Sequence, residues 1–485
     1  MRLLDESRWR GSVYLDGWTK GSGGEAPVVE PATGAHLGTM GVAGPDDVKI
    51  AARAAAAAQR DWAALPYTER AAVLRRAGDL WTAHADEIAG WIVREAGSLA
   101  PKGATEIEVA AQECYEAATL PSHPYGELLP SAQPRMSWAQ RVPVGVVGVI
   151  SPFNFPVILS IRSVAPALAL GNAVVLKPDQ RTAVCGGVAV ARVFEEAGLP
   201  AGLLHVLPGG PEVGEALITD PLVRTVSFTG SSATGRRVGA LAGEHLKRVH
   251  LELGGNSAMI VLDDVDVERA VSVAAFGSFL HQGQVCMTTG RHLVHEAVYD
   301  QYVRRLAEKA SHLPVGDPTT GQVALGPLID EGQRDRVHDL VSRSVDAGAK
   351  LAAGGTYEGL FYRPTVLAET RPEMPAYAEE VFGPVAPVTR FSTVEEAVAL
   401  AGGTDYGLAL GILTRDVMKG LAIAERVPTG TVHINDQTVN DEAHIPFGGV
   451  GISGTGARFG GAANIEAFTD QRWVTIRADL PTYPF

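Results

Sequence analysis

The sequence predicts an α/β protein built from two doubly wound, Rossmann-like α/β domains and a small β oligomerisation element. Short, almost continuous apolar runs recur from residue 142 to residue 434, and stretches with helical spacing separate them. Such runs are typical of parallel strands that are buried on both faces. The 485 residues, 46% hydrophobic and 20% charged, are those of an ordinary globular protein with about three structural units.

The first domain is expected to combine residues 1–120 with residues 143–254. After an irregular start, residues 46–120 are rich in Ala, Glu, Arg and Leu, which predicts several amphipathic helices. The runs VPVGVVGVI, AVVL, LLHVL, VRTVSF and RVHLEL then predict buried strands that alternate with helices.

Residues 255–454 repeat this alternation, from AMIVL through RHLVH to TVHIN, and predict a second α/β domain. Two segments, 121–142 and 455–485, fit neither sheet. The second contains the extended run QRWVTIRA, and an unpaired strand edge readily pairs with another. We expect the two segments to pair with each other or with another subunit, as a bridging and oligomerisation element.

Charge and composition argue against several classes of partner. The 41 basic and 55 acidic residues give a net charge of −14, which repels nucleic acid and anionic lipid, so a small molecule is the expected partner. The longest apolar stretch is interrupted by Pro143, Pro152 and Pro156, so no membrane span is expected. The N-terminus lacks the apolar core of a signal peptide, and three widely spaced cysteines predict neither disulfides nor a metal site. We therefore expect a cytoplasmic protein.

Two features favour a bound phosphate compound. FTGSSATG places Gly230 and Ser231 between a strand and a helix, where free N–H groups and the helix dipole attract a pyrophosphate. A simple helix cap is an equally good interpretation. Lys177 ends the strand AVVL, at the edge where α/β sheets bind ligands, although a lysine leaving a strand end is the commoner case. GGVGISG matches the dinucleotide fingerprint but lacks the strand and helix that this fingerprint needs.

Three residues could carry covalent chemistry. Cys286, in GQVCMTTG, has small and polar neighbours that leave room for a substrate, whereas Cys114 and Cys185 lie in apolar helical patterns. A thiol needs a nearby base or dipole to become a thiolate. Glu252 ends the strand HLEL and could be that base, or a solvated carboxylate; Asn154 could donate to an oxyanion, or form a turn.

Seven motifs, in order, resemble the aldehyde dehydrogenase superfamily: PFNFP, VVLKP, FTGS, LELGG, GQVC, EEVFGP and PFGG. The resemblance covers essentially the whole chain. It implies that the first domain binds NAD or NADP, that the second is catalytic, and that the protein forms a homodimer or homotetramer.

The resemblance also implies roles for individual residues. Cys286 becomes the nucleophile, Asn154 and the Cys286 N–H hold the oxyanion, and Glu252 activates water. The implied cofactor residues are Lys177 and Glu380 at the riboses, Gly230 and Ser231 at the pyrophosphate, and Phe382 and Phe153 near the nicotinamide. Many members carry Trp in place of Phe153, and NAD-preferring members carry a glutamate at the position of Gln180. The missing charge makes NADP acceptable, although Asp179 could oppose its 2′-phosphate.

Two stretches, SIRSVAPALALGNAVVLKPD and SFLHQGQVCMTTGRHLVHE, are similar to benzaldehyde and vanillin dehydrogenases within this superfamily. An aromatic aldehyde oxidised to its acid is therefore the expected reaction, with Phe155, Ile158, Arg162 and Phe447 at the substrate. Ile158 and Arg162 share a helix face, and Arg162 could stack on the aldehyde or could be a surface arginine. A coenzyme A-acylating dehydrogenase and an inactive cofactor-binding relative are the alternatives.

Overall fold

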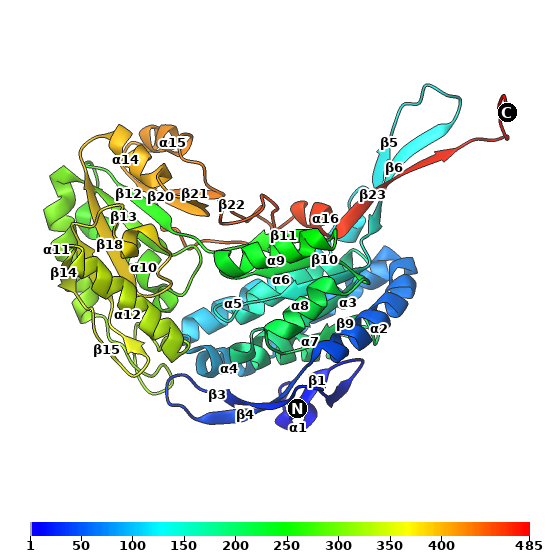
Figure 1. The fold of residues 1–485 in the computed structure, drawn as a ribbon, viewed down its shortest axis with the longest axis horizontal. Coiled ribbons are helices and arrows are strands. Elements are labelled where there is room, and N and C mark those ends of the chain that lie inside the picture. Colours follow the sequence, from blue (N-terminus) through cyan, green and yellow to red (C-terminus); the bar gives the residue numbers. More distant parts are fainter. Residues whose placement is uncertain (1) are drawn as a thin grey trace.

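The computed structural model describes residues 2–485 and contains two α/β units, with a three-stranded arm that projects from the first unit (Figure 1). Within these residues no helix combines the length and the apolar character needed to cross a lipid bilayer. The predicted class, with two largely parallel sheets, is confirmed.

The first sheet has seven strands in the order β11-β10-β7-β8-β9-β1-β2. Five of them are parallel: β7 (Val146–Ile150), β8 (Ala173–Lys177), β9 (Leu204–Val206), β10 (Val223–Thr229) and β11 (Arg248–Glu252). The expectation of an irregular N-terminus was wrong, because β1 (Ser12–Tyr14) and β2 (Trp18–Lys20) extend this sheet as antiparallel edge strands. These strands have three residues each, too short for a period to show in the sequence.

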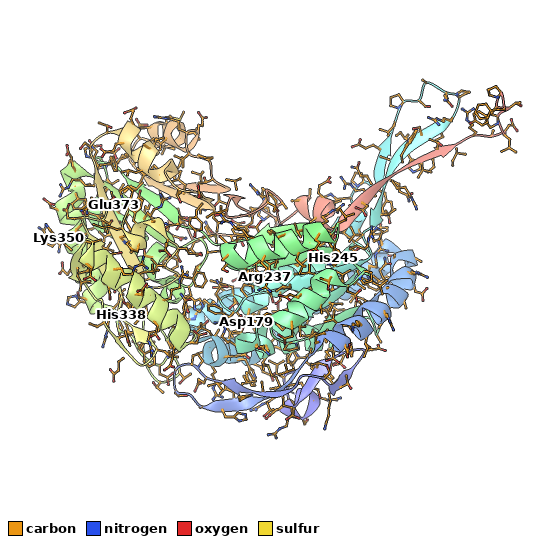
Figure 2. All side chains as sticks on the ribbon, viewed as in Figure 1. Asp179, Arg237, His245, His338, Lys350 and Glu373 are labelled. Atoms are coloured by element: carbon orange, nitrogen blue, oxygen red, sulfur yellow. The ribbon has the colours of Figure 1, made fainter. Side chains whose placement is uncertain are left out.

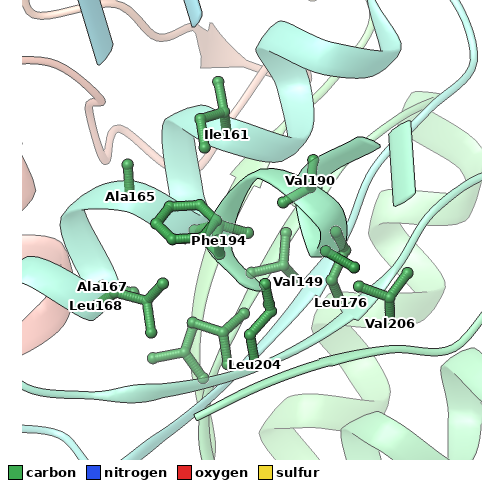
Figure 3. Packing of buried hydrophobic residues seen from close by; sticks show 14 of the residues in the cluster. Val149, Ile161, Ala165, Ala167, Leu168, Leu176, Val190, Phe194, Leu204 and Val206 are labelled. Carbon is green, nitrogen blue, oxygen red and sulfur yellow. The ribbon is translucent and has the colours of Figure 1, made fainter. Parts of the chain in front are cut away.

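Helices cover both faces of this sheet. One face carries α2 (Pro45–Ala64), α8 (Pro211–Thr219) and α9 (Ser232–Glu244), and the other carries α6 (Pro156–Ala169) and α7 (Ala189–Glu196). Outside α6 and α7 pack α3 (Tyr67–Ala83), α4 (Ala85–Ala96) and α5 (Ala100–Ala117). Val149, Leu176 and Val206 of the strands pack against Ile161 and Phe194 of the helices (Figure 3). Every residue labelled in this view is apolar. The burial of α6 on all sides explains its almost entirely apolar sequence.

The second sheet also has seven strands, in the order β14-β17-β18-β13-β12-β20-β21. Its strands are β12 (Ser257–Val261), β13 (Thr289–His295), β14 (Lys350–Ala353), β17 (Thr365–Ala368), β18 (Val385–Phe391), β20 (Ala409–Leu413) and β21 (Thr431–Ile434), and only β14 is antiparallel. One face carries α10 (Val267–Phe279) and α11 (Glu296–His312), and the other carries α14 (Val394–Gly402) and α15 (Val417–Ala424). Near the edge, α12 (Glu331–Asp346) packs against α13 (Pro375–Ala378).

The arm joins segments that lie more than 300 residues apart in the chain. Strand β6 (Met136–Pro143) pairs on one side with β5 (Gly126–Leu128) and on the other with β23 (Thr469–Ile476), which follows α16 (Ala463–Phe468). The expected pairing between the two leftover segments is therefore present within one chain. The arm exposes large apolar side chains, among them Leu128, Met136, Trp473 and Ile476, and the terminal Leu480, Tyr483 and Phe485.

Small elements complete the fold. A hairpin of β3 (Gly24–Val29) and β4 (His36–Val42) follows α1 (Glu6–Trp9), and two short ladders join β15 (Tyr357–Glu358) to β16 (Phe361–Tyr362) and β19 (Tyr406–Gly407) to β22 (Val450–Gly451). Short 3₁₀ turns lie at η1 (Leu120–Ser122), η2 (Gln180–Thr182) and η4 (Leu280–Gly283), and a π-helical turn, η3 (Val184–Val188), precedes α7.

Candidate active site

A cavity of about 1030 Å³ lies between the two units. The register of the first sheet sets Ile150 beside Lys177 and Thr229 beside Glu252, so the carboxyl ends of four strands meet at one edge. Opposite this edge, Cys286 precedes the start of β13. Asp179 and Arg237, both in the cavity lining, mark the side contributed by the first unit (Figure 2).

The cavity lining brings together nine of the residues that the sequence singled out. These are Phe153, Asn154, Lys177, Gln180, Gly230, Ser231, Cys286, Glu380 and Phe382. Glu252 lies just outside this lining, while its chain neighbours Leu253 and Gly254 belong to it.

The loop before Cys286 has an unusual backbone. His281, Gln282 and Gly283 have φ values of 49°, 56° and 67°, so two residues with side chains adopt the left-handed conformation that normally favours glycine. Backbone strain of this kind persists only where the surrounding structure holds it, and Gln282 is held by its donation to the carbonyls of Gly97 (3.0 Å) and Pro327 (2.8 Å). The loop thus presents Cys286 to the cavity in a fixed pose, whereas Cys114 and Cys185 are fully buried.

The expectation that a base or dipole assists the Cys286 thiol stays a prediction. Burial, Glu380 and Glu252 together raise the pKa of Cys286 to about 12, and only Arg162 acts in the opposite direction. A thiol facing two acidic groups in a buried site stays protonated at neutral pH. An added positive charge in the cavity would lower this pKa.

Asn154 lies in the loop between β7 and α6, and its side chain is buried. The amide Nδ2 donates to the carbonyl oxygen of Gln284 at 2.8 Å, which ties Asn154 to the segment two residues before Cys286. An amide so placed can also donate toward an oxygen that becomes negative beside the thiol.

A buried ion pair on α5 supports this loop, and no local sequence pattern indicates it. Lys102 and Glu106 form the pair, with side chains 3% and 0% exposed. Lys102 also donates to the Asn154 carbonyl at 2.7 Å and lies 4.1 Å from the centre of the Phe155 ring. Glu106 accepts the N–H groups of Val157 (3.1 Å) and Ile158 (3.4 Å) at the start of α6. A Lys and a Glu four residues apart on a helix usually form a solvated pair, so only the packing reveals this one.

Glu252 ends β11 and is also buried. Its Oε2 accepts the N–H of Gly449 at 3.3 Å, and a side chain at Gly448 would place its first carbon 2.6 Å from Oε1. The Gly-rich GGVGISG run therefore lies against the carboxylate instead of opening a nucleotide-binding helix. Burial raises the pKa of Glu252 well above its ordinary value, while Arg162 and Arg458 oppose that shift. A carboxyl with a raised pKa is suited to accept a proton near neutral pH.

The candidate cofactor residues fit a dinucleotide. Gly230 and Ser231 stand at the start of α9, where backbone N–H groups face the cavity edge; Ser231 accepts the Thr234 N–H at 3.3 Å and so also caps the helix. Glu380 is fixed by the Gly255 N–H at 2.9 Å, and burial raises its pKa to about 7. A side chain at Gly254 would clash with Glu380, so the glycine keeps the two units close.

Two aromatic rings form one wall of the cavity. Phe153 and Phe382 meet edge to face with centroids 5.9 Å apart, and Phe382 has a φ of 55°. Such rings can flank a planar heterocycle. Positive φ at a bulky residue marks a strained position of the kind found at ligand sites.

Arg181, whose contacts no sequence motif indicates, changes the charge around Gln180. Its guanidinium pairs with Asp179 at 2.8 Å and with Asp330 of the second unit at 2.5 Å, and it lies 4.3 Å from the centre of the Phe153 ring. Asp179 is thus already neutralised by a cation, so it opposes a 2′-phosphate less than its charge alone suggests.

The four expected substrate residues do not belong to the lining of this cavity. Arg162 is 2% exposed, so the alternative of a surface arginine was wrong. Its guanidinium pairs with Asp441 and, at 3.5 Å, with Glu113, and it lies 4.9 Å from the centre of the Phe447 ring. Phe155 contacts Lys102 and His281, and Ile158 is buried at the start of α6.

A thiol, an amide donor and a carboxyl group therefore lie at or beside a cavity of about 1030 Å³ where two α/β units face each other. The chain belongs to the aldehyde dehydrogenase family, whose model matches residues 18–474, and is an NAD(P)-dependent enzyme. The predicted resemblance is confirmed.

Among curated proteins, a vanillin dehydrogenase from Amycolatopsis sp. is 68% identical over 486 residues, covering 100% of both chains. A benzaldehyde dehydrogenase [NAD(+)] from Pseudomonas putida is 53% identical and covers 98% of each. Among solved structures, a salicylaldehyde dehydrogenase from Pseudomonas putida G7 complexed with salicylaldehyde has a TM-score of 0.94 at 35% identity, covering 98% of this chain and 99% of its own.

Proposed function

We propose that this enzyme oxidises an aromatic aldehyde of the benzaldehyde type to the carboxylic acid, with Cys286 as the nucleophile. The observation that carries the proposal is the meeting of Cys286 and Asn154 in one cavity, with the Glu252 carboxyl close enough to act on the thiol's pKa. The substrate class is supported by the names of the relatives at 68% and 53% identity.

In the proposed mechanism the Cys286 thiolate attacks the aldehyde carbon, and the carbonyl oxygen becomes the oxyanion of a thiohemiacetal. The Asn154 amide and the Cys286 N–H donate to this oxygen. When bound, the oxidised nicotinamide supplies the hydride acceptor and a positive charge that favours the thiolate. Lys177 and Glu380 would hold the riboses, and Ser231 with Gly230 would hold the pyrophosphate.

Loss of hydride from the thiohemiacetal carbon re-forms the carbonyl and leaves a thioester on Cys286. Glu252 then takes a proton from the water that attacks this thioester, so the acid is released and Cys286 leaves as a thiolate. Neither transfer of the acyl group to coenzyme A nor an inactive site would use such a base. The carboxyl is held by Gly449 beside a buried site, which keeps bulk water from competing.

The proposal is tested by reduced-nicotinamide absorbance over a panel of benzaldehyde, vanillin and hexanal with NAD and with NADP, in the absence of coenzyme A. Aromatic aldehydes should give the higher kcat/KM, with stoichiometric acid. Loss of acid formation without coenzyme A would favour the acylating alternative, and no reduction with any aldehyde would favour the inactive one.

Arg162 lies behind the cavity lining, and within this proposal it acts on the substrate side of the site through its charge and the rings that it packs on. Its guanidinium lies over Phe447 at 4.9 Å and over Phe459 at 5.4 Å, and its charge acts on both Cys286 and Glu252. A cation beside two aromatic rings suits an aromatic aldehyde. If Arg162 and the residues Phe155, Ile158 and Phe447 select the substrate, Arg162→Lys should reduce the benzaldehyde-to-hexanal ratio of kcat/KM. An unchanged benzaldehyde-to-hexanal ratio would contradict a role for Arg162 in substrate selection.

The arm supports a homodimer or a homotetramer. Its two edge strands expose large apolar side chains, Leu128 on β5 and Trp473 and Ile476 on β23, and exposed apolar edges of this kind normally become buried against a second copy. Three free cysteines suit the reducing conditions of the cytoplasm. Light scattering of the full chain and of a Trp473→Asp variant would test the assembly.

A further inference from the structure

His250 is a buried titratable side chain to which the mechanism above gives no role. It precedes Glu252 by two residues on β11, and alternate residues of a strand point to the same side. The Nε2 atom of His250 lies 3.5 Å from Oε1 of Glu252. Both side chains are 3% exposed, so no bulk water separates them.

Within residues 2–485, neither ring nitrogen of His250 makes a hydrogen bond, and neither does the Oε1 atom of Glu252. The Oε2 atom of Glu252 accepts the Gly449 N–H. Leaving buried polar atoms unpaired is costly, so a hydrogen bond between Nε2 of His250 and Oε1 of Glu252 is favoured. The imidazole lies flat on Phe459, with centroids 3.9 Å apart and planes 23° apart, so its plane is set by packing.

The charges around the pair favour a neutral imidazole. Burial, Arg162 of α6 and Arg458 of the loop that follows β22 all act against a charged ring, and lower the pKa of His250 to about 3. The groups that act on the Glu252 carboxyl are the same two arginines, the Gly449 N–H and Asp441. A neutral imidazole carries one N–H, and Oε1 is the acceptor within reach.

We propose that His250 is a positioning residue that donates its Nε2–H to Oε1 of Glu252, and so holds this carboxylate ionised and oriented for thioester hydrolysis. The proposal rests on the role of Glu252 proposed above. Two donors, the imidazole and the Gly449 N–H, then fix both carboxylate oxygens. A carboxyl group whose ionised form accepts two hydrogen bonds loses its proton more readily than one whose ionised form accepts a single bond.

The test compares His250→Phe, which keeps a ring against Phe459 and removes the donor, with His250→Gln, which keeps an N–H at about the Nε2 position. In His250→Phe we expect thioester hydrolysis to slow by about ten- to a hundredfold, the range for a hydrogen bond to a charged group. A burst of reduced cofactor should persist, because the earlier steps are intact. The acidic limb of the kcat profile should move up by about one pH unit, and His250→Gln should recover most of both effects.

His245→Gln, at an exposed position on the turn that ends α9, is the matched control and should behave as the parent enzyme. An unchanged acidic limb and hydrolysis rate in His250→Phe would overturn the proposal. Equal losses in both His250 variants, together with lower thermal midpoints, would overturn it in favour of simple packing.

The Glu252→Gln variant distinguishes a failure of Glu252 as the base from a failure of His250 as its positioning residue. If Glu252→Gln hydrolyses the thioester normally, the proposed base is wrong, whatever His250 does. If Glu252→Gln is slow and His250→Phe is normal, only the positioning role fails. The double variant should be no slower than Glu252→Gln alone, because His250 acts through that carboxylate.

Discussion

Replacement of Lys102 by Met tests whether the buried ion pair of α5 holds the Asn154 loop. Met has a similar length and no charge, so the change removes the contacts to Glu106 and to the Asn154 carbonyl and leaves the packing volume nearly constant. Glu106 keeps its bonds to the N–H groups of Val157 and Ile158 but loses its cation partner, Lys102.

The expected loss of stability follows from this geometry. Removing one partner of a buried pair leaves an uncompensated charge and costs about 3–5 kcal/mol. For a cooperative unit of about 150–250 residues this lowers the thermal midpoint by roughly 6–20 °C. Burial lowers the pKa of Lys102 and raises that of Glu106, and each side chain opposes the shift of the other, so Glu106 should take up a proton in the variant.

The assay is scanning calorimetry of Lys102→Met, Glu106→Gln and the double variant, combined with kcat at a temperature where all are folded. The double variant should melt above Lys102→Met, because no unpaired charge remains. With a loosened Asn154 the kcat should fall while KM for the cofactor stays constant. A double variant that melts lower by the sum of the single effects, or a Lys102→Met enzyme with the parent kcat, would refute the reasoning.

Four further outcomes are expected. Asn154→Ala should lower kcat by about a hundred- to a thousandfold, as the loss of one oxyanion donor does; a smaller effect in stopped-flow traces would assign that role elsewhere. Without cofactor, alkylation of Cys286 by iodoacetamide should accelerate about tenfold per pH unit between pH 7 and 10, since its raised pKa of about 12 leaves the thiolate fraction proportional to hydroxide; a plateau near pH 8 would contradict this. NAD should accelerate the same alkylation at fixed pH, and Cys286→Ser should abolish both labelling and turnover. Gln180→Glu should lower kcat/KM for NADP relative to NAD by about tenfold through added negative charge, with Gln180→Asn as the neutral control.

The parts of the site that the sequence predicted share one property: each follows the carboxyl end of a buried strand or carries a motif. Lys177 and Glu252 end strands whose character is visible in the chain, and Gly230 directly follows another, so their convergence follows from parallel pairing alone. Cys286 stood out by its small and polar neighbours.

The parts that the sequence did not predict depend on contacts between distant segments. Lys102 and His250 look ordinary in the chain, because nothing local shows that the first is buried under Asn154 or that the second faces Glu252. The strands β1 and β2 also leave no recognisable sequence pattern, because an alternation with a period of two cannot be seen in three residues.

The loop that holds Glu252 has a consequence for how the chain matures. Glu252 belongs to the first unit, yet the N–H that fixes it comes from Gly449, 197 residues later, after the whole second sheet. A nascent chain that has reached β21 already contains Cys286, Asn154 and most residues of the cavity lining. The Glu252 carboxyl gains its Gly449 anchor only when the segment after β21 has been added, so the proposed hydrolytic step depends on a part of the chain that is made after both large sheets.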